Sequence, residues 1–217
     1  MLEWSTIMMM HGDVSGPSLR AVADIVRGGG IIAFPTETFY GLGVCPFNAR
    51  AVHRLAELKD RERRVAPILV LIRSRADLSG LVSEITPTAE RLMETCWPGP
   101  LTLVFRAAMG LPSALTAGTG TIGIRVSAHP GVQRLLEAVG GPLTGTSANL
   151  AGRPAATMAS DVAFALGDGV DAIVDGGPAA GGLPSTVVDT TVTPPRLIRS
   201  GCLSETVLRS VIHSLAA

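Results

Sequence analysis

The sequence has little of several features that would assign it to a common class of protein. Its 217 residues include only three cysteines, Cys45, Cys96 and Cys202, which are widely spaced and form no C-x-x-C pair. Such cysteines argue against a disulfide scaffold or a zinc site and favour a reducing compartment. No hydrophobic run approaches the roughly 18 residues of a membrane-spanning helix, and the first ten residues lack the basic start of a signal peptide. We therefore predict a cytoplasmic protein that has no membrane partner.

The chain also has no net charge. Lys and Arg together number 18, and so do Asp and Glu. A protein that binds nucleic acid regardless of sequence needs a broad basic surface, which this balance does not provide. Any anion site must therefore be local, and the basic residues are indeed concentrated at Lys59, Arg61, Arg63 and Arg64.

Two familiar nucleotide-binding signatures are missing or misplaced. The phosphate-binding loop G-x-x-x-x-G-K-[ST] does not occur. Gly118-x-Gly120-x-x-Gly123 spells the dinucleotide fingerprint, but it leads into an apolar stretch that alternates as a strand does. In a dinucleotide-binding unit these glycines open a helix. We therefore exclude a nicotinamide or flavin role for this segment.

A serine-hydrolase signature is nearly matched by Gly145-Thr146-Ser147-Ala148-Asn149. Asn149 stands where the second glycine of G-x-S-x-G belongs, and none of the four histidines has a context diagnostic of a catalytic base. Alternate residues of a strand project to the same side, so we interpret Ser147 and Asn149 as hydrogen-bonding groups at a strand end.

Short apolar strands alternate with amphipathic helices along the chain, which predicts helices on both faces of a sheet. Asn48 and Ser204 are expected to cap two of the helices. Helices are expected at 17–26, 49–58, from 87, at 132–139 and from 205, and strands at 31–34, 68–72, 101–105, 121–126, 142–146, 172–175, 185–188 and 196–198. We predict one α/β domain of the α+β type over residues 1–217, with a twisted mixed sheet and an irregular tail over about residues 1–14. The Gly/Pro-rich stretch 176–184 is either a plain connection or a mobile flap.

The most informative segment is Pro35-Thr36-Glu37-Thr38-Phe39-Tyr40-Gly41-Leu42-Gly43, which places hydroxyls and a carboxylate directly after a buried strand. Three further motifs follow in order: Lys59-Asp60-Arg61, Thr146-Ser147-Ala148-Asn149 and Pro184-Ser185-Thr186-Val187-Val188-Asp189. Through this ordered set, the chain from about Ser18 to about Leu208 resembles the YrdC-like superfamily and, within it, the threonylcarbamoyl-AMP synthases. The resemblance implies a YrdC-like fold.

It also implies a reaction. Enzymes of this type use ATP, L-threonine and bicarbonate to form threonylcarbamoyl-AMP and pyrophosphate, a nucleotidyl transfer that supplies the tRNA N6-threonylcarbamoyladenosine modification. The reaction needs no protein nucleophile, which agrees with the missing hydrolase machinery. The implied partners are the downstream tRNA threonylcarbamoyl transferase machinery, and weak RNA binding stays open.

The resemblance also implies roles for particular residues. Thr36, Arg125 and Ser185 fall where the family contacts threonine, with Arg125 suited to hold the carboxylate as a fork. Lys59 and Arg61 are the implied catalytic pair. The nucleotide and its phosphates are assigned to Lys59, Arg61, Thr121, Ser147, Asn149, Arg153 and Arg199. Mg²⁺ would be carried by the ATP phosphates, so no carboxylate cage for a metal is expected.

Three positions depart from the family pattern. Glu62 replaces the usual Pro after the K-x-R pair, Ser200 replaces the Pro between Arg199 and Gly201, and Leu71 stands where the family has a His that lines the amino-acid pocket. Leu71 predicts relaxed selection among amino acids. Two alternatives follow: an enzyme that forms a carbamoyl-adenylate for another acceptor, and a non-catalytic RNA-binding relative.

Overall fold

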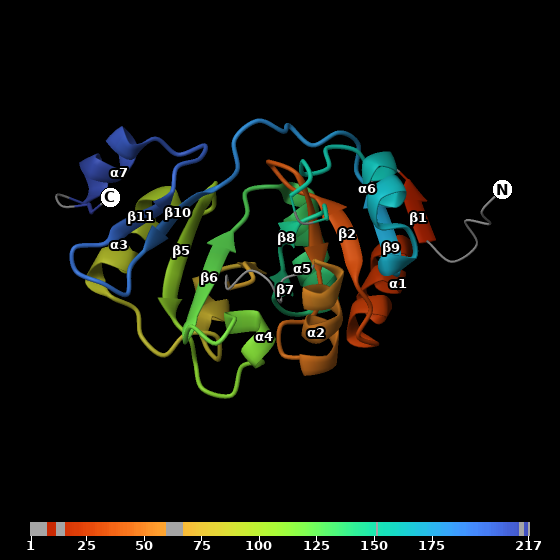
Figure 1. The fold of residues 1–217 in the computed structure, drawn as a ribbon, viewed down its shortest axis with the longest axis horizontal. Helices are drawn as coiled ribbons and strands as arrows, with labels where there is room; N and C mark the ends of the chain where they lie inside the picture. Colours follow the sequence, from red (N-terminus) through yellow and green to blue (C-terminus); the bar gives the residue numbers. More distant parts are fainter. Residues whose placement is uncertain (1–7, 12–15, 60–66, 151, 213–214, 217) are drawn as a thin grey trace.

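The computed structural model describes residues 8–11, 16–59, 67–150, 152–212 and 215–216 (Figure 1). The helices are α1 (Gly16–Arg27), α2 (Ala49–Leu58), α3 (Pro87–Cys96), α4 (Ser113–Thr116), α5 (Pro130–Val139), α6 (Ala159–Leu166) and α7 (Glu205–Val211), with 3-10 turns at Arg75–Leu78 and Gly167–Gly169. The strands are β1 (Met8–His11), β2 (Ile32–Pro35), β3 (Tyr40–Gly43), β4 (Val70–Ile72), β5 (Leu101–Arg106), β6 (Thr121–Val126), β7 (Leu143–Thr144), β8 (Thr146–Ser147), β9 (Ala172–Asp175), β10 (Thr186–Asp189) and β11 (Arg196–Arg199).

The strands form two mixed sheets. The first sheet has the order β1-β9-β2-β3-β8, and the second has the order β11-β10-β5-β6-β4-β7. Each contains parallel and antiparallel neighbours: β2 pairs parallel with β9 and antiparallel with β3, and β5 pairs parallel with β10 and antiparallel with β6. The predicted α/β class with mixed pairing is confirmed, but the strands divide into two sheets instead of forming one.

The division occurs at Gly145. The predicted strand 142–146 is broken into β7, which pairs with β4 of the second sheet, and β8, which pairs with β3 of the first. Gly145 lies between them and donates its backbone N–H to the carbonyl of Leu69 at 2.8 Å. A Cβ atom at this position would lie 2.7 Å from Cγ of Leu71, so only glycine allows the chain to cross between the sheets here.

Helices cover both faces of the first sheet. Alternate residues of β2 point to opposite sides: Ile32 and Phe34 belong to a cluster with side chains of α1 and α5, whereas Ala33 belongs to the main core with Val162 of α6. The main core continues through the buried faces of β5 and β6 to α3 and α7. The predicted two-sided cover is therefore present around this sheet (Figure 1).

Local hydrogen bonds explain where several helices begin. Asn48 Oδ1 accepts from the backbone N of Ala51 at 3.1 Å, and Ser204 Oγ accepts from that of Val207 at 3.4 Å, so both predicted caps are confirmed. Thr86 caps α3 in the same way, with Pro87 at the first helical position.

Two strands were not predicted. Met8–His11, expected within an irregular tail, form β1 and pair in parallel with β9, which would otherwise be the edge of the first sheet. Tyr40–Gly43, expected within a loop, form β3. The glycines obscured β3, although Gly43 has a packing reason: a Cβ there would lie 2.6 Å from the ring of Phe34.

Within the described ranges, no helix has the length and hydrophobicity needed to cross a bilayer. Cys45, Cys96 and Cys202 are all free.

Candidate active site

The turn between β2 and β3 is organised by Thr36. Its hydroxyl oxygen accepts from the backbone N of Thr38 at 3.2 Å and of Phe39 at 3.3 Å, and donates to the carbonyl of Phe39 at 2.7 Å. One buried side chain thus satisfies three backbone groups of the turn, which fixes the polar motif at the end of β2.

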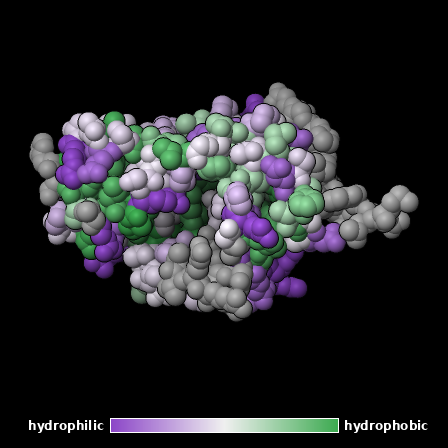
Figure 2. Space-filling model, turned by 45° about the horizontal axis from the view of Figure 1, so that its top comes forward, coloured by the Kyte–Doolittle hydropathy of each residue, from purple (hydrophilic) through white to green (hydrophobic). Residues whose placement is uncertain are grey.

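A cavity of about 320 Å³ lies between the two sheets, and we call it the inter-sheet cavity. The first sheet contributes the β2–β3 turn and β8, and the second contributes β5, β6, β10 and β11. Figure 2 shows a hollow near the middle of one face, with hydrophobic atoms on its wall and hydrophilic atoms beside it. Five residues assigned to substrates from the sequence line this cavity: Thr36, Arg125, Ser147, Ser185 and Arg199.

Arg125 is the main electrostatic feature of the cavity. Its side chain is only 3% exposed, and its Nη1 lies 3.6 Å from Oε1 of Glu37. Within the described part of the chain, Arg125 Nε and Glu37 Oε1 are buried and have no hydrogen-bond partner. Burial lowers the pKa of Arg125, and the Glu37 carboxylate acts in the opposite direction. A buried guanidinium that retains an unused donor is suited to an anionic ligand with oxygens that can accept from it.

Ser185 and Arg199 line the cavity from the β10–β11 edge of the second sheet, the sheet that also carries Arg125. Arg199 donates to the carbonyl of Ser185 from Nε at 3.1 Å and from Nη2 at 2.9 Å, and Nη2 also donates to the Ser185 hydroxyl at 3.0 Å. That hydroxyl lies 2.9 Å from the hydroxyl of Thr102. Burial, and then the nearby charge of Arg125, lower the pKa of Arg199. Both guanidinium groups line one cavity, and the positive charge of Arg125 disfavours the charged form of Arg199. An anion bound between two like charges would relieve this repulsion.

Lys59 ends α2 beside the cavity and is not a solvated charge. It is 6% exposed, and its Nζ donates to the carbonyl of Ser147 at 2.6 Å and to Oδ1 of Asn149 at 2.6 Å. It also donates to the backbone carbonyl of Asn149. The Ser147 hydroxyl donates to the same Oδ1 at 2.6 Å. The Lys59, Ser147 and Asn149 side chains therefore form one hydrogen-bonded cluster at the end of β8.

The remaining predicted residues lie elsewhere. Thr121 is the first residue of β6 and faces the same side of that strand as Arg125. It does not line the cavity, and its hydroxyl lies 2.8 Å from that of Thr119. The Arg153 side chain is exposed, and the hydrogen bonds described for Arg153 are those of its backbone: its N–H donates to the carbonyl of Leu150 at 3.1 Å, and its carbonyl accepts from the side-chain amide nitrogen of Asn149. Arg61 falls outside the described residues.

Leu71 does not lie where the sequence comparison suggested. It is fully buried in the cluster with Phe34 and Leu135, beside Gly145, and it does not line the inter-sheet cavity. Pro67 and Leu69 line the cavity instead. The prediction of relaxed selectivity, which required Leu71 to line the pocket, therefore loses its physical basis in this structure.

Sequence reasoning did not identify Thr102, Glu37 and Ser127 as members of the site. Thr102 sits in an apolar strand, where threonine is common without any ligand. Glu37 stands inside the motif that was singled out, so its position was a usable signal. Ser127 lies two residues after Arg125 and therefore on the same side of the chain, which is a weaker indication that it belongs to the site.

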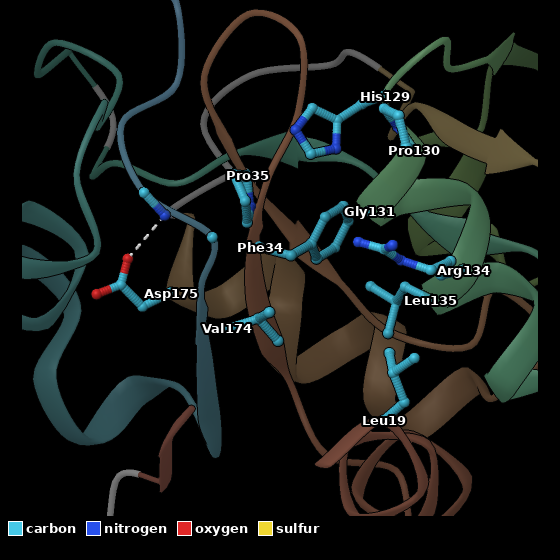
Figure 3. Close-up of a pocket in the computed structure, with 12 residues that line it drawn as sticks. Leu19, Phe34, Pro35, His129, Pro130, Gly131, Arg134, Leu135, Val174 and Asp175 are labelled. Carbon is cyan, nitrogen blue, oxygen red and sulfur yellow. Dashed lines mark hydrogen bonds between the residues drawn. The ribbon is translucent and has the colours of Figure 1, made fainter. Parts of the chain in front are cut away.

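A second and larger cavity, of about 680 Å³, lies on the outer side of the first sheet, and we call it the outer cavity. Figure 3 shows Phe34, Val174 and Leu135 on its apolar wall, with His129 and Arg134 beside them. The carboxylate of Asp175 is held by the backbone N of Gly177 at 3.0 Å. None of the substrate residues assigned from the sequence lines this cavity, so size alone does not locate the site.

No group of three or more His, Cys, Asp or Glu side chains in the described segments is placed to hold a metal ion. The described residues that line the inter-sheet cavity include hydroxyls but no carboxylate. They do not form a magnesium site by themselves.

Two sheets with a cavity between them, lined by the buried Arg125, the more exposed Arg199 and ordered hydroxyls, define an α/β protein with a cavity suited to small anions. The Sua5_yciO_yrdC family model, described as "Telomere recombination", matches residues 24–201. The chain belongs to this family, and the resemblance seen in the sequence is confirmed.

Individual relatives agree with this assignment. The chain is 39% identical over 197 residues to a threonylcarbamoyl-AMP synthase of Pyrococcus abyssi, a match that covers 91% of this chain and 58% of the relative. It is 40% identical over 174 residues to a threonylcarbamoyl-AMP synthase of Vibrio cholerae serotype O1, covering 79% and 92%. The structure of P. abyssi Sua5 complexed with L-threonine superposes with a TM-score of 0.91 at 36% identity, covering 97% of this chain and 62% of that one. The chain thus spans about three fifths of the length of the P. abyssi relative and of the solved P. abyssi Sua5 chain.

Proposed function

We propose that this protein is a threonylcarbamoyl-AMP synthase that takes ATP, L-threonine and bicarbonate and releases pyrophosphate. The observation that carries the proposal is Arg125, a buried guanidinium on a small cavity with an unused Nε donor among the described residues. The name of the full-length relatives and the threonine bound to the P. abyssi protein support the same assignment.

In this proposal, the threonine carboxylate binds Arg125. Thr36 and Ser185 lie on the same cavity: Ser185 supplies a hydroxyl for the rest of the amino acid, and the Thr36 hydroxyl, used by three backbone groups of the turn, holds that turn against the ligand. Each hydroxyl is already oriented, that of Thr36 by the Phe39 carbonyl and that of Ser185 by Thr102, so little ordering is required when the ligand enters.

The chemistry then needs positioning and charge stabilisation more than covalent catalysis. The threonine amine attacks the carbon of CO₂ derived from bicarbonate, which gives a carbamate after loss of a proton. A carbamate oxygen attacks the α-phosphorus of ATP, the bond from that phosphorus to the bridging oxygen breaks, and pyrophosphate leaves. Cationic groups stabilise the charge that develops on the phosphoryl oxygens.

Arg199, Lys59 and Arg61 are assigned to the nucleotide phosphates, with Ser147, Asn149, Thr121 and Arg153 as further nucleotide contacts. Lys59 already donates to Ser147 and Asn149. To bind Lys59, a phosphate oxygen therefore has to replace one of these acceptors. Nucleotide binding would then change the hydrogen bonds of Ser147 and Asn149 at the end of β8. Mg²⁺ would arrive with the ATP phosphates, and no step is derived through it.

A cytoplasmic location and a downstream tRNA threonylcarbamoyl transferase belong to the same proposal. The alternative of a carbamoyl-adenylate for another acceptor depended on Leu71. Because Leu71 is buried away from the cavity, no observation of the structure favours that alternative.

The test is mass spectrometry of products, together with pyrophosphate release, from ATP, Mg²⁺, bicarbonate and one amino acid at a time. We expect threonylcarbamoyl-AMP, and pyrophosphate release that requires both bicarbonate and L-threonine. Equal release without the two co-substrates would show that the protein is not this synthase.

A further inference from the structure

Glu37 forms a link between the two walls of the inter-sheet cavity. Glu37 lies in the β2–β3 turn of the first sheet. The two residues that it contacts belong to the second sheet or directly follow it: Arg125 lies in β6, and Ser127 is the first residue after β6. Its Oε2 accepts from the hydroxyl of Ser127 at 2.5 Å, and its Oε1 lies 3.6 Å from Nη1 of Arg125. Glu37 itself is not among the described residues that line the cavity, so its reach to a ligand is indirect.

The contact between Glu37 and Arg125 has an unusual geometry. At 3.6 Å it is an ion pair without a hydrogen bond, and in the described part of the chain Oε1 has no hydrogen-bond partner. The carboxylate therefore compensates the buried charge of the guanidinium without accepting a hydrogen bond from it, and the Nε donor stays unused among the described residues. A bidentate pair would have used the same donors that an anionic ligand needs.

Ser127 fixes the carboxylate in this position. Its hydroxyl donates to Glu37 and accepts from the backbone N of His129 at 3.1 Å, so both of its functions are used. His129 is the residue just before α5, so the hydroxyl is tied to the beginning of a helix. His129 and Pro35, which ends β2, both line the outer cavity (Figure 3).

We propose that Glu37 is a positioning residue that holds Arg125 in the orientation in which it receives the carboxylate of the amino-acid substrate. The proposal rests on the function proposed above. It predicts that removing the charge of Glu37 disturbs amino-acid binding selectively, because the contacts described for this carboxylate are with Ser127 and Arg125, which lie on the amino-acid side of the proposed site.

Glu37→Gln is the main test variant, because glutamine keeps the shape and can still accept from Ser127 but carries no charge. The matched control is Glu84→Gln. Glu84 also lies 3.6 Å from an arginine, Arg106, but both side chains of that pair are more than half exposed. Ser127→Ala is the second variant: it keeps the Glu37 charge and releases the carboxylate from its anchor.

Calorimetry would give the dissociation constants of L-threonine and ATP for each folded variant. We expect about a tenfold weaker threonine affinity for Glu37→Gln, a smaller loss for Ser127→Ala, ATP affinity within about twofold of the parent, and no change for Glu84→Gln. Unchanged threonine affinity in Glu37→Gln would overturn the proposal. Equal weakening of both ligands would also overturn it, because that result indicates general damage to the fold.

A ligand-free readout separates this proposal from the proposed function. The Nε–Hε resonance of Arg125, assigned by its loss in Arg125→Lys, should exchange slowly with solvent in the parent and in Glu84→Gln, and faster in Glu37→Gln. An unchanged resonance in Glu37→Gln means that Glu37 does not hold Arg125, whether or not the protein binds threonine. If the parent fails to bind threonine while the resonance responds as expected, the proposed function fails and the positioning role stands.

Discussion

The two cavities of this molecule differ in the state of their polar groups more than in their size. The outer cavity is about 680 Å³ and the inter-sheet cavity about 320 Å³, yet it is the smaller one that contains a buried arginine with an unused donor. Both volumes are within or close to the range of ligand sites. Each cavity is lined by a residue with a buried polar atom that has no hydrogen-bond partner among the described residues: Arg125 Nε at the inter-sheet cavity and His129 Nδ1 at the outer one. What separates the two is charge, because burial lowers the pKa of His129 and favours its neutral ring. A buried guanidinium without a full set of partners costs more free energy, and a ligand can remove that cost.

The same comparison applies to arginines. Arg125 lies on the inter-sheet cavity with 3% of its side chain exposed, whereas the exposed Arg106 pairs with Glu84 at the surface. Surface pairs of this kind contribute little to stability. A guanidinium taken out of water between two sheets is therefore the residue whose removal should have the largest consequence.

Arg125→Ala should have the largest effect. Truncating one partner of a buried charged contact costs about 2–5 kcal/mol, which predicts a loss of threonine affinity of roughly 30-fold or more. Calorimetry with L-threonine would measure it, with Arg106→Ala as the control at an exposed position. Similar threonine affinities for Arg125→Ala and the parent would remove the distinction between the two cavities.

Lys59→Ala should have the next largest effect, and on stability as well as on ATP binding. The change leaves acceptors of Ser147 and Asn149 without their charged donor, at a cost of about 1.5–3 kcal/mol. For a chain of this size that corresponds to roughly 3–12 °C in Tm. Arg50→Ala, at an exposed position of the same helix, should leave Tm unchanged. A normal Tm for Lys59→Ala would mean that the side chain is solvated.

Tyr40 tests the boundary between the cavities. It lines the inter-sheet cavity, and its hydroxyl donates at 2.7 Å to the carbonyl of Gly177, which lines the outer cavity. Burial, and then the charge of Asp175, raise the pKa of Tyr40 from 10.0 to about 12. Because the folded state favours the protonated phenol, the stability contributed by this group is present below pH 10 and is lost as the pH rises through about 12.

Tyr40 is the only tyrosine in the chain, so its ionisation can be followed by ultraviolet absorbance while circular dichroism reports the fold. We expect a midpoint near 12 in the folded protein, and no such transition in Tyr40→Phe. A midpoint near 10 with the native dichroism retained would show that the phenol is accessible to solvent.

Arg134→Ala should have the smallest effect. Arg134 lines the outer cavity, and removing it should leave the affinities for threonine and ATP within about twofold of the parent. A loss comparable to that of Arg125→Ala, measured under the same conditions, would mean that the outer cavity belongs to the active site.

The sequence predicted those elements whose local signals are strong. The strand 121–126 matches β6, and Asn48 and Ser204 cap the helices as expected, because a cap depends on three or four neighbouring residues. The strand β3 was missed because its two glycines are poor strand formers, and the packing reason for Gly43, the ring of Phe34, is a tertiary contact. The split into two sheets at Gly145 was missed for the same reason, since the atom that requires glycine there belongs to Leu71.

For the site too, the sequence was informative about individual residues and uninformative about contacts between distant strands. Thr36, Arg125, Ser147, Ser185 and Arg199 line one cavity although they come from five different parts of the chain, and their roles toward substrates stay predictions. The buried state of Lys59 and the indirect role of Glu37 could not be predicted, because both depend on which residues of distant strands face them. The position of Leu71 was misjudged because the sequence alone does not reveal which side chains of a strand buried on both faces meet the cavity.

The central claim is that Arg125 and the inter-sheet cavity recognise the carboxylate of threonine. The most direct measurement compares calorimetric titrations of the parent protein with L-threonine and with L-threoninol, which keeps the amine and the side chain but has no carboxylate. The account predicts that threoninol binds at least about tenfold more weakly, since it cannot use the buried guanidinium. Equal affinity for the two compounds would contradict the account.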